Sequence, residues 1–113
     1  MSSKIEVLNP ATGLAIGTVD NASIADCLHA VDMAHDAFVS WKNTAPRVRA
    51  EILRKAFDIM IAEQEELART ITLEMGKVLS DARAEVAYAA EFFRWFSEEA
   101  VRIDGDYRRA PSG

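Results

Sequence analysis

Near the start of the chain, over residues 5–19, apolar residues occur in short runs that are typical of β-strands. The runs IEVL and LAIGTV are rich in aliphatic and β-branched residues, and NPATG separates them. In that segment Pro10 has the fixed φ angle that a turn needs, and Gly13 can adopt a positive φ angle. We therefore predict a pair of short strands over 5–19. Two strands alone are marginally stable in water, so the pair needs another surface to lie against.

After residue 22 the apolar residues recur every three or four positions, which is the spacing of an amphipathic helix. The first predicted helix covers 23–42. Ser23 stands at its N-cap position, and Asp26, three residues later, gives a near-match to a capping box. Free cysteine is among the most buried residue types, so we expect Cys27 to be buried within the apolar stripe. That stripe consists of Ile24, Cys27, Leu28, Val31, Ala34 and Phe38.

Two further helices are predicted, over 46–75 and 80–103, and the remaining residues, 104–113, have the composition of a loop. The chain is therefore predicted to be mostly α, with three helices and a short N-terminal strand pair, and 1–113 is treated as one unit. The second helix is expected to turn one apolar face inward. That face carries Val48, Ile52, Ala56, Ile59, Met60, Leu67 and Ile71.

The ends of these two helices carry typical signals. Thr44 is the expected N-cap of the second helix, with Pro46 in its first turn, where a missing N–H group costs little. Gly76 stands where a left-handed residue would end that helix. Ser80 is the expected N-cap of the third, and the charge of Asp81 complements the positive end of its dipole. The string TLEMGKVL thus marks a helix end followed by a helix start.

The third predicted helix is more apolar than so small a chain can cover, because small domains bury a lower fraction of their surface. An exposed aromatic patch usually marks an interface. Two interpretations stay open: the chain forms a homo-oligomer or self-associates through the face around Tyr88, Phe92 and Trp95, or it is part of something larger. At about 100° per residue, one sector of the helix holds Tyr88, Phe92, Trp95 and Phe96, flanked by Val86, Ala89 and Phe93.

The composition limits the classes of function. The sequence is 50% hydrophobic and 27% charged, which is typical of soluble globular proteins. Its formal net charge of -5 argues against nucleic-acid binding, which needs a basic face. The apolar runs are too short to span a membrane. The first residues have no apolar signal core, and a single cysteine cannot form an internal disulfide, so we expect a reducing, cytoplasmic location.

Residues that could carry chemistry are scattered. The glycines form no phosphate-binding loop, and no cluster of His, Cys, Asp and Glu has metal-ligand spacing. Glu85 and Glu99 project into the apolar arc, but about 21 Å of helix separates them, so each is expected to pair with a group on a neighbouring segment. His29 and His35 lack the i, i+4 spacing of helical metal ligands, and Cys27 has no local base. We assign no catalytic, cofactor-binding or metal-binding residue.

Several segments taken together resemble one family. They are NPATG, AHDAFVSWKNTAPRVRAEILRKAFDIM, LARTITLEMGK and EVAYAAEFFRWFSEEAVRIDGD. In order and spacing, from Ile5 to Asp106, they resemble the N-terminal part of aldehyde dehydrogenases. Within that superfamily, TLEMGK and AEFFRWFSEEAVRIDGD look most like NAD(P)-dependent succinate-semialdehyde dehydrogenases. One departure is Val78, since the family usually has proline after the Gly-Lys pair.

This resemblance implies that the chain is the N-terminal part of a cofactor-binding domain. The parent protein would be an α/β protein with a Rossmann-like cofactor domain, and its catalytic and oligomerisation parts would lie outside 1–113. It also implies a chemistry in which a cysteine thiolate attacks the aldehyde, hydride passes to NAD or NADP, and a glutamate-activated water releases the acid. None of those residues maps onto this chain, so the chain alone is predicted to bind no cofactor and to be inactive. The same resemblance implies that Glu85 is a candidate contributor to the alkali-ion site that some family members have.

Two functions follow as hypotheses. In the first, the chain is part of an oxidoreductase that oxidises a small-molecule aldehyde, succinic semialdehyde in particular, to the carboxylic acid with NAD(P). The alternative is a free-standing helical interaction module that uses its aromatic face. The sequence leaves open the aldehyde, the choice between NAD and NADP, and the oligomeric state.

Overall fold

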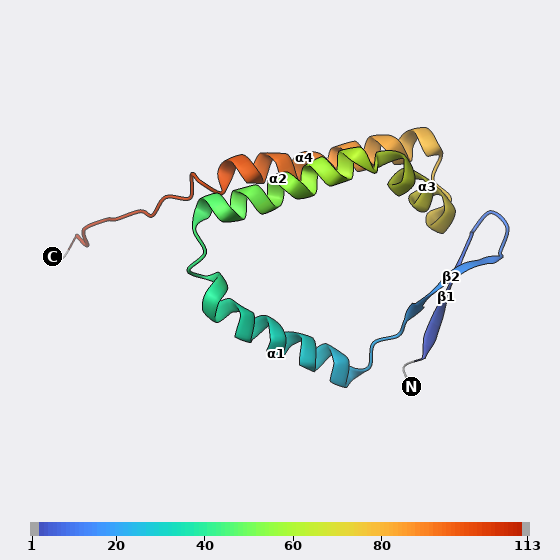
Figure 1. The fold of residues 1–113 in the computed structure, drawn as a ribbon, viewed down its shortest axis with the longest axis horizontal. Coiled ribbons are helices and arrows are strands. Elements are labelled where there is room, and N and C mark those ends of the chain that lie inside the picture. The colour runs from blue at the N-terminus through green and yellow to red at the C-terminus, as the bar shows by residue number, and fades with distance from the viewer. Residues whose placement is uncertain (1–2, 112–113) are drawn as a thin grey trace.

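The computed structural model describes residues 3–111 and is shown in Figure 1. An antiparallel hairpin precedes four helices, of which three form a packed bundle and one stands apart (Figure 1). The Cα radius of gyration is 20.1 Å, whereas a compact domain of this length has a value of roughly 13 Å. The fold is therefore open. Its elements are β1 (Lys4–Leu8), β2 (Ala15–Asp20), α1 (Ile24–Trp41), α2 (Pro46–Ala62), α3 (Gln64–Met75) and α4 (Leu79–Glu99).

The hairpin confirms the predicted strand pair. Strand β1 pairs antiparallel with β2, and at its open end Lys4 lies opposite Asp20, with 2.5 Å between Nζ and Oδ1. In the turn, the N–H of Gly13 donates to the carbonyl of Asn9 over 2.7 Å, and Gly13 has a φ angle of 71°. The proline and glycine of NPATG therefore have the roles that the sequence indicates.

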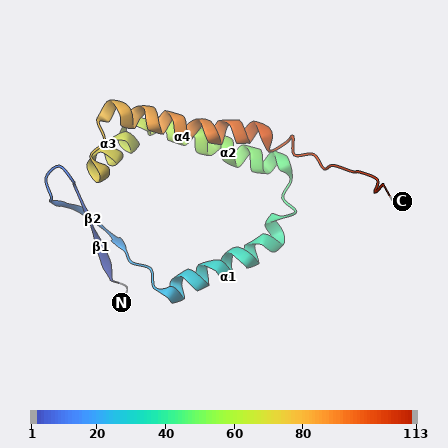
Figure 2. The ribbon, with the colours of Figure 1, turned by 180° about the vertical axis from the view of Figure 1, so that it is seen from behind.

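Helix α1 begins as predicted but is not buried. The Ser23 N–H donates to Asp26 Oδ2 over 2.8 Å, and the Asp26 N–H donates to Ser23 Oγ over 3.2 Å, which completes the capping box. The expectation that Cys27 is buried was wrong: Cys27 is exposed, as is the rest of the stripe. The reason is that no other helix packs along α1, as Figures 1 and 2 show from opposite sides.

The single helix predicted over 46–75 is two helices, α2 and α3. Glu63 leaves the helical region, with a ψ angle of 14°, so the chain turns and α3 lies against the start of α4. The turn lets the Gln64 side chain donate to the carbonyl of Arg83 over 3.0 Å. Ala45, not Thr44, is the N-cap residue of α2, because its extended backbone precedes Pro46, which stands in the first turn as predicted.

Helix α4 starts earlier and ends earlier than predicted. Its N-cap is Val78, whose carbonyl accepts from the N–H groups of Asp81 and Ala82 over 3.0 and 2.9 Å. Ser80 therefore lies inside the helix and does not cap it. Regular structure ends at Glu99, so 100–103 form a turn and the start of an extended segment, and residues 104–111 have no regular element, as predicted. Residues 112–113 of the predicted loop lie outside the described part.

The core is a contact between small residues. Helix α4 packs along both α2 and α3, and the side that it turns toward them carries Ala82, Val86, Ala90 and Ser97, all buried. Ala68 of α3 and Ala50 of α2 are buried opposite them. Small side chains let helix backbones approach closely. Within residues 3–111 no large side chain is fully buried.

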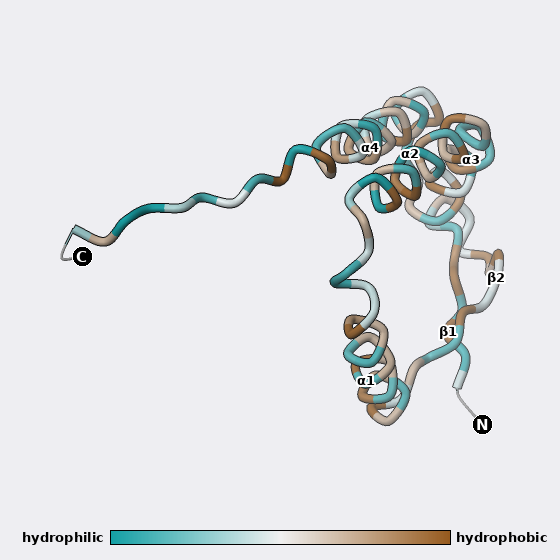
Figure 3. Tube along the Cα trace, turned by 60° about the vertical axis from the view of Figure 1, so that its left-hand side comes forward, coloured by the Kyte–Doolittle hydropathy of each residue, from teal (hydrophilic) through white to brown (hydrophobic). Residues whose placement is uncertain are grey.

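The inner face predicted for the second helix is confirmed only in part: Ala56 and Met60 of α2 are half-buried, and Leu67 and Ile71 of α3 pack against the core. Val48, Ile52 and Ile59 are about half exposed, while Ala50 is buried and Leu53, four-fifths of a turn further on, is half-buried. The helix has apolar residues on two sides, and α4 covers only one of them. In Figure 3, brown hydrophobic residues recur along α1 as well as along α2 and α4.

The hairpin turn touches the end of α3. Gly76 ends that helix in the left-handed conformation, with a φ angle of 77°, as predicted. A Cβ atom at Gly76 would lie 3.1 Å from Cγ of Pro10, which is tighter than ordinary van der Waals contact. Two parts of the sequence that look like separate turn signals therefore meet at one contact, while the two strands themselves stay largely exposed.

This contact predicts that Gly76→Ala destabilises the chain by about 2 kcal/mol, because an L side chain is strained at positive φ and the new methyl group would press on Pro10. Urea unfolding followed by circular dichroism measures the effect. Gly105→Ala is the matched control, since nothing lies within 4 Å of a Cβ there. Adding Pro10→Ala should recover the steric part of the loss; no recovery would show that the hairpin does not press on Gly76.

Candidate functional site

Helix α4 leaves an aromatic face uncovered. Tyr88 is 67% exposed and Trp95 is 61% exposed, with Phe92 and Phe96 about half exposed. The Tyr88 and Phe92 rings meet edge to face, with 5.1 Å between centroids. The predicted uncovered arc is therefore confirmed, with one correction. Val86, placed beside the arc, lies in the core against α3 because it faces the other side of α4.

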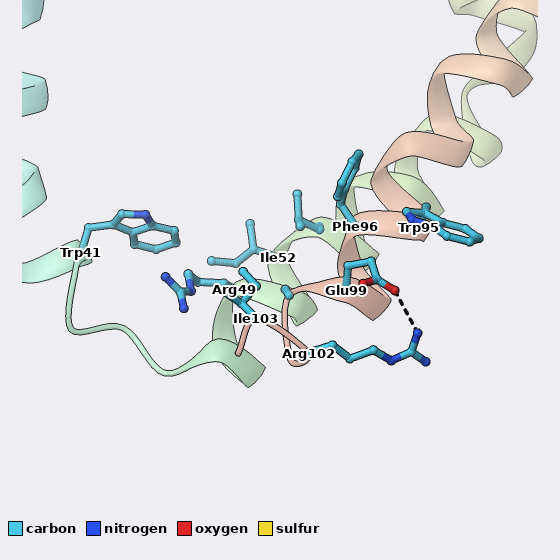
Figure 4. A pocket seen from close by; sticks show the side chains of 10 residues that line it. Trp41, Arg49, Ile52, Trp95, Phe96, Glu99, Arg102 and Ile103 are labelled. Atoms are coloured by element: carbon cyan, nitrogen blue, oxygen red, sulfur yellow. Dashed lines mark hydrogen bonds and ion pairs between the residues drawn. The ribbon is translucent and has the colours of Figure 1, made fainter. Parts of the chain in front are cut away.

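A groove extends this face toward α1 and α2. It has a volume of about 580 Å³, and its walls come from the end of α1, the start of α2 and the end of α4 (Figure 4). Trp41 faces Ile52 across it, and Arg102 turns outward to pair with Glu99, with 2.9 Å between Nη1 and Oε1. The groove is apolar with a charged rim. It is lined by Trp41, Arg49, Ile52, Leu53, Trp95, Phe96, Glu99, Ala100, Arg102 and Ile103.

The two glutamates that the sequence places in the apolar arc are both paired, as predicted. Glu85 accepts from Lys77, which lies in the connection between α3 and α4. Glu99 accepts from Arg102, just after α4. Each carboxylate is at least one-third exposed. They stand at opposite ends of α4 and have separate partners, so the arrangement does not bring two carboxyl groups to one substrate bond.

The other reactive side chains lie on α1. Cys27, His29 and His35 are all exposed. Within residues 3–111, no three side chains of His, Cys, Asp or Glu come together as metal ligands would, and no helix is long and apolar enough to cross a membrane. Residues 3–111 taken together offer an apolar packing surface. That the chain has no catalytic or cofactor-binding residue stays a prediction.

One charged contact was not predicted. Arg83 of α4 donates two hydrogen bonds to Glu65 of α3, over 2.8 and 2.9 Å, and Arg69 approaches the same carboxylate to 3.4 Å. The hydrogen bond from Arg83 lowers the pKa of Glu65. This fork holds α3 on the helix that carries the aromatic face. Periodicity could not reveal it, since the two residues belong to different helices and the break at Glu63 brings them together.

Comparison with known proteins decides the family. The model of the aldehyde dehydrogenase family matches residues 1–112. The chain belongs to the aldehyde dehydrogenase family. It is 54% identical over 87% of its length to succinate-semialdehyde dehydrogenase from Paenarthrobacter nicotinovorans, and 47% identical over 90% to glutarate-semialdehyde dehydrogenase from Pseudomonas aeruginosa. It spans 22% and 21% of these two relatives, about one-fifth of their length.

Solved structures of the family have the same local fold. An aldehyde dehydrogenase from Brucella melitensis superposes with a TM-score of 0.92 at 46% identity, over 96% of this chain and 23% of that one. Succinate-semialdehyde dehydrogenase from Burkholderia pseudomallei superposes with a TM-score of 0.90 at 41% identity, with the same coverage. The open arrangement of hairpin, α1 and bundle is therefore the one that these larger enzymes have in the matching segment.

The Glu65–Arg83 fork predicts an acid-dependent stability. The pKa of Glu65 is lower in the folded state than in the unfolded state. The stability that Glu65 contributes to the fold is therefore fully present above the unfolded pKa, near 4.5, and is lost as the pH falls through the folded pKa. Lowering the pH from about 5 to about 3 should therefore reduce the unfolding free energy of the unaltered chain more than that of Glu65→Gln. Urea unfolding at each pH measures this difference.

Glu66→Gln is the control for that experiment. It removes the adjacent carboxylate, which forms no ion pair within residues 3–111, and should leave the pH dependence as it is. Equal pH dependence in Glu65→Gln and the unaltered chain would show that the fork does not stabilise the fold.

Proposed function

We propose that this chain is the N-terminal part of an aldehyde dehydrogenase subunit that oxidises a semialdehyde, succinic semialdehyde in particular, to the carboxylic acid with NAD or NADP. The observation that carries the proposal is the match to succinate-semialdehyde dehydrogenase, 54% identical over 87% of the chain but spanning only 22% of the relative. In that setting the chain supplies packing surface, and the reacting groups come from the other four-fifths of the subunit.

The exposed apolar faces support this assignment. An isolated domain rarely leaves aromatic side chains such as Tyr88 and Trp95 in water. Here α1, α2 and α4 each leave an apolar side uncovered. A large remaining part of the subunit, with the Rossmann-like domain that the family resemblance implies, would cover them.

The names of the relatives narrow the substrate. Succinate-semialdehyde and glutarate-semialdehyde dehydrogenases both act on an aldehyde that ends in a carboxylate. One relative, from Escherichia coli, is named for NADP⁺, and one solved family structure is a complex with nicotinamide adenine dinucleotide. We propose a short carboxylate-bearing aldehyde as substrate, either dinucleotide as cofactor, and a cytoplasmic location. The chain by itself would bind neither the aldehyde nor the dinucleotide and would be inactive.

Reconstitution in trans tests the proposal. The chain is co-expressed with the Paenarthrobacter succinate-semialdehyde dehydrogenase that lacks its matching first fifth. With succinic semialdehyde and NAD or NADP, reduced cofactor should appear when both pieces are present and not with either alone. Ala82→Asp, which places a charge in the core, should abolish the activity, whereas Cys27→Ala should retain it because Cys27 is not the nucleophile.

Two outcomes would contradict the proposal. One is turnover by the 113-residue chain alone that Cys27→Ala abolishes. The other is a co-purified, folded pair of pieces without activity toward any short aldehyde.

We also propose that the chain without the rest of the subunit self-associates through the aromatic face around Tyr88, Phe92 and Trp95. The exposure of these rings supports this, and it is also the observation that favours the alternative of an interaction module. Light scattering should give at least twice the mass of one chain, and Trp95→Glu should lower that mass. A monomer that binds no apolar dye would rule out self-association.

A further inference from the structure

The groove between α1, α2 and α4 holds a cation that has no partner within residues 3–111. Of the basic residues in that range, Arg49 and Lys77 are the two that are not exposed. Lys77 pairs with Glu85. Arg49 lines the groove, and within 3–111 its guanidinium group forms no ion pair, hydrogen bond or contact with an aromatic ring. The fold therefore leaves a half-buried charge unpaired.

The neighbouring arginines of α2 are arranged differently. Arg47 Nη1 lies 4.0 Å from Glu51 Oε1, and Arg54 Nε lies 3.7 Å from Asp58 Oδ1. All four of these side chains are exposed, so water solvates them as well. Arg49 combines the two opposite features, since it is drawn out of water and lacks a carboxylate one turn away on its own helix.

The acid in the groove is already taken. Among the lining residues Glu99 is the one acid, and it accepts from Arg102 over 2.9 Å. In Figure 4 the guanidinium group of Arg49 lies on the Trp41 side of the groove and points away from Glu99. Two arginines against one glutamate give the lining a net charge of +1 among apolar side chains. The complementary surface is apolar and carries one negative charge.

A surface that fills the groove removes the remaining water from Arg49. An arginine buried without a partner is costly, whereas its planar fork matches a carboxylate with two parallel hydrogen bonds. The relative from Paenarthrobacter has about four-fifths of its length outside the matched segment, and the exposed faces of this chain need a cover of that kind. The acid that Arg49 lacks therefore has a source in the same subunit.

We infer that an apolar segment of the remaining part of the same subunit fills this groove and sets an aspartate or glutamate against Arg49. The inference rests on the proposed function, in which the rest of the subunit covers these faces, and it names the contact. Apolar side chains of the segment lie against Trp41, Ile52 and Phe96, and its carboxylate accepts hydrogen bonds from Arg49. The pair sets the register of docking, because a shifted segment leaves both charges buried and unpaired.

Zero-length crosslinking in a full-length subunit tests the contact. This hybrid subunit is the Paenarthrobacter succinate-semialdehyde dehydrogenase with the present chain in place of its matching first fifth. Arg49→Lys puts a primary amine in the groove, and a carbodiimide joins an amine to a carboxylate that touches it. Peptide mass spectrometry should find a bond from position 49 to an aspartate or glutamate outside 1–113. Arg47→Lys is the matched control, and its bonds should stay with Glu51 because it lies on the exposed side of α2.

Charge reversal measures what the contact contributes. Arg49→Glu should raise the rate constant of thermal inactivation of the hybrid subunit about tenfold or more, because two carboxylates would then face each other out of water. Arg47→Glu should change that rate at most about twofold. Replacing the crosslinked acid by lysine in the Arg49→Glu protein should return the rate close to its original value. A double variant as labile as Arg49→Glu would overturn the inference.

Three crosslinking results would also overturn it. One is a folded hybrid subunit in which Arg49→Lys forms no bond to a residue outside 1–113. The second is a covalent dimer, which would place the acid in a neighbouring subunit. The third, with succinic semialdehyde added, is a bond from position 49 to the carboxylate of the substrate itself.

The activity of the hybrid subunit without further substitutions is a separate measurement. A folded hybrid that does not oxidise any short aldehyde would contradict the proposed function, whereas the bond at position 49 would still decide the contact. An active hybrid without that bond would leave the proposed function standing and remove the inference.

Discussion

The close contact between α4 and the α2–α3 pair is the constraint on which the rest of the structure depends. It is made by alanines, with Ala68 and Ala82 fully buried and Val86 nearly so. Small residues let the helices approach, but they bury little apolar area, and stabilisation scales with that area. The bundle therefore has specific geometry with a modest core. Several of its large apolar side chains, such as Tyr88 and Trp95, are exposed and add little to the stability of the fold.

The contacts around the two ends of α3 make this helix a support for the hairpin turn and for α4. At one end Gly76 takes the left-handed conformation and lies under Pro10 of the hairpin. At the other, Glu65 receives the fork of Arg83. The hairpin, α3 and α4 are thereby tied together without a large core. A support of this kind suits a segment that spans about one-fifth of its relatives and presents broad apolar surfaces.

Some of the fold was predictable because it depends on residues close together in the sequence. The turn at Gly13 and the capping box of Ser23 and Asp26 involve neighbours within four positions, so local preference decides them. The aromatic face was predictable for a different reason. Helical periodicity fixes which side chains share a side, and the side with Tyr88 and Trp95 was too large for a short chain to cover.

The sequence by itself therefore determined the hairpin, the mostly helical character of the rest, the uncovered aromatic face and the family, because turn chemistry, periodicity and ordered motifs are properties of the chain. Only the tertiary structure decided where the second helix breaks and which side of it is buried. Nothing local marks Glu63 as a break, since no proline or glycine stands there; the gain comes from seating α3 on α4 through Glu65 and Arg83. Likewise, Cys27 is exposed because a stripe is buried only when another surface covers it, and a helical pattern cannot specify that partner.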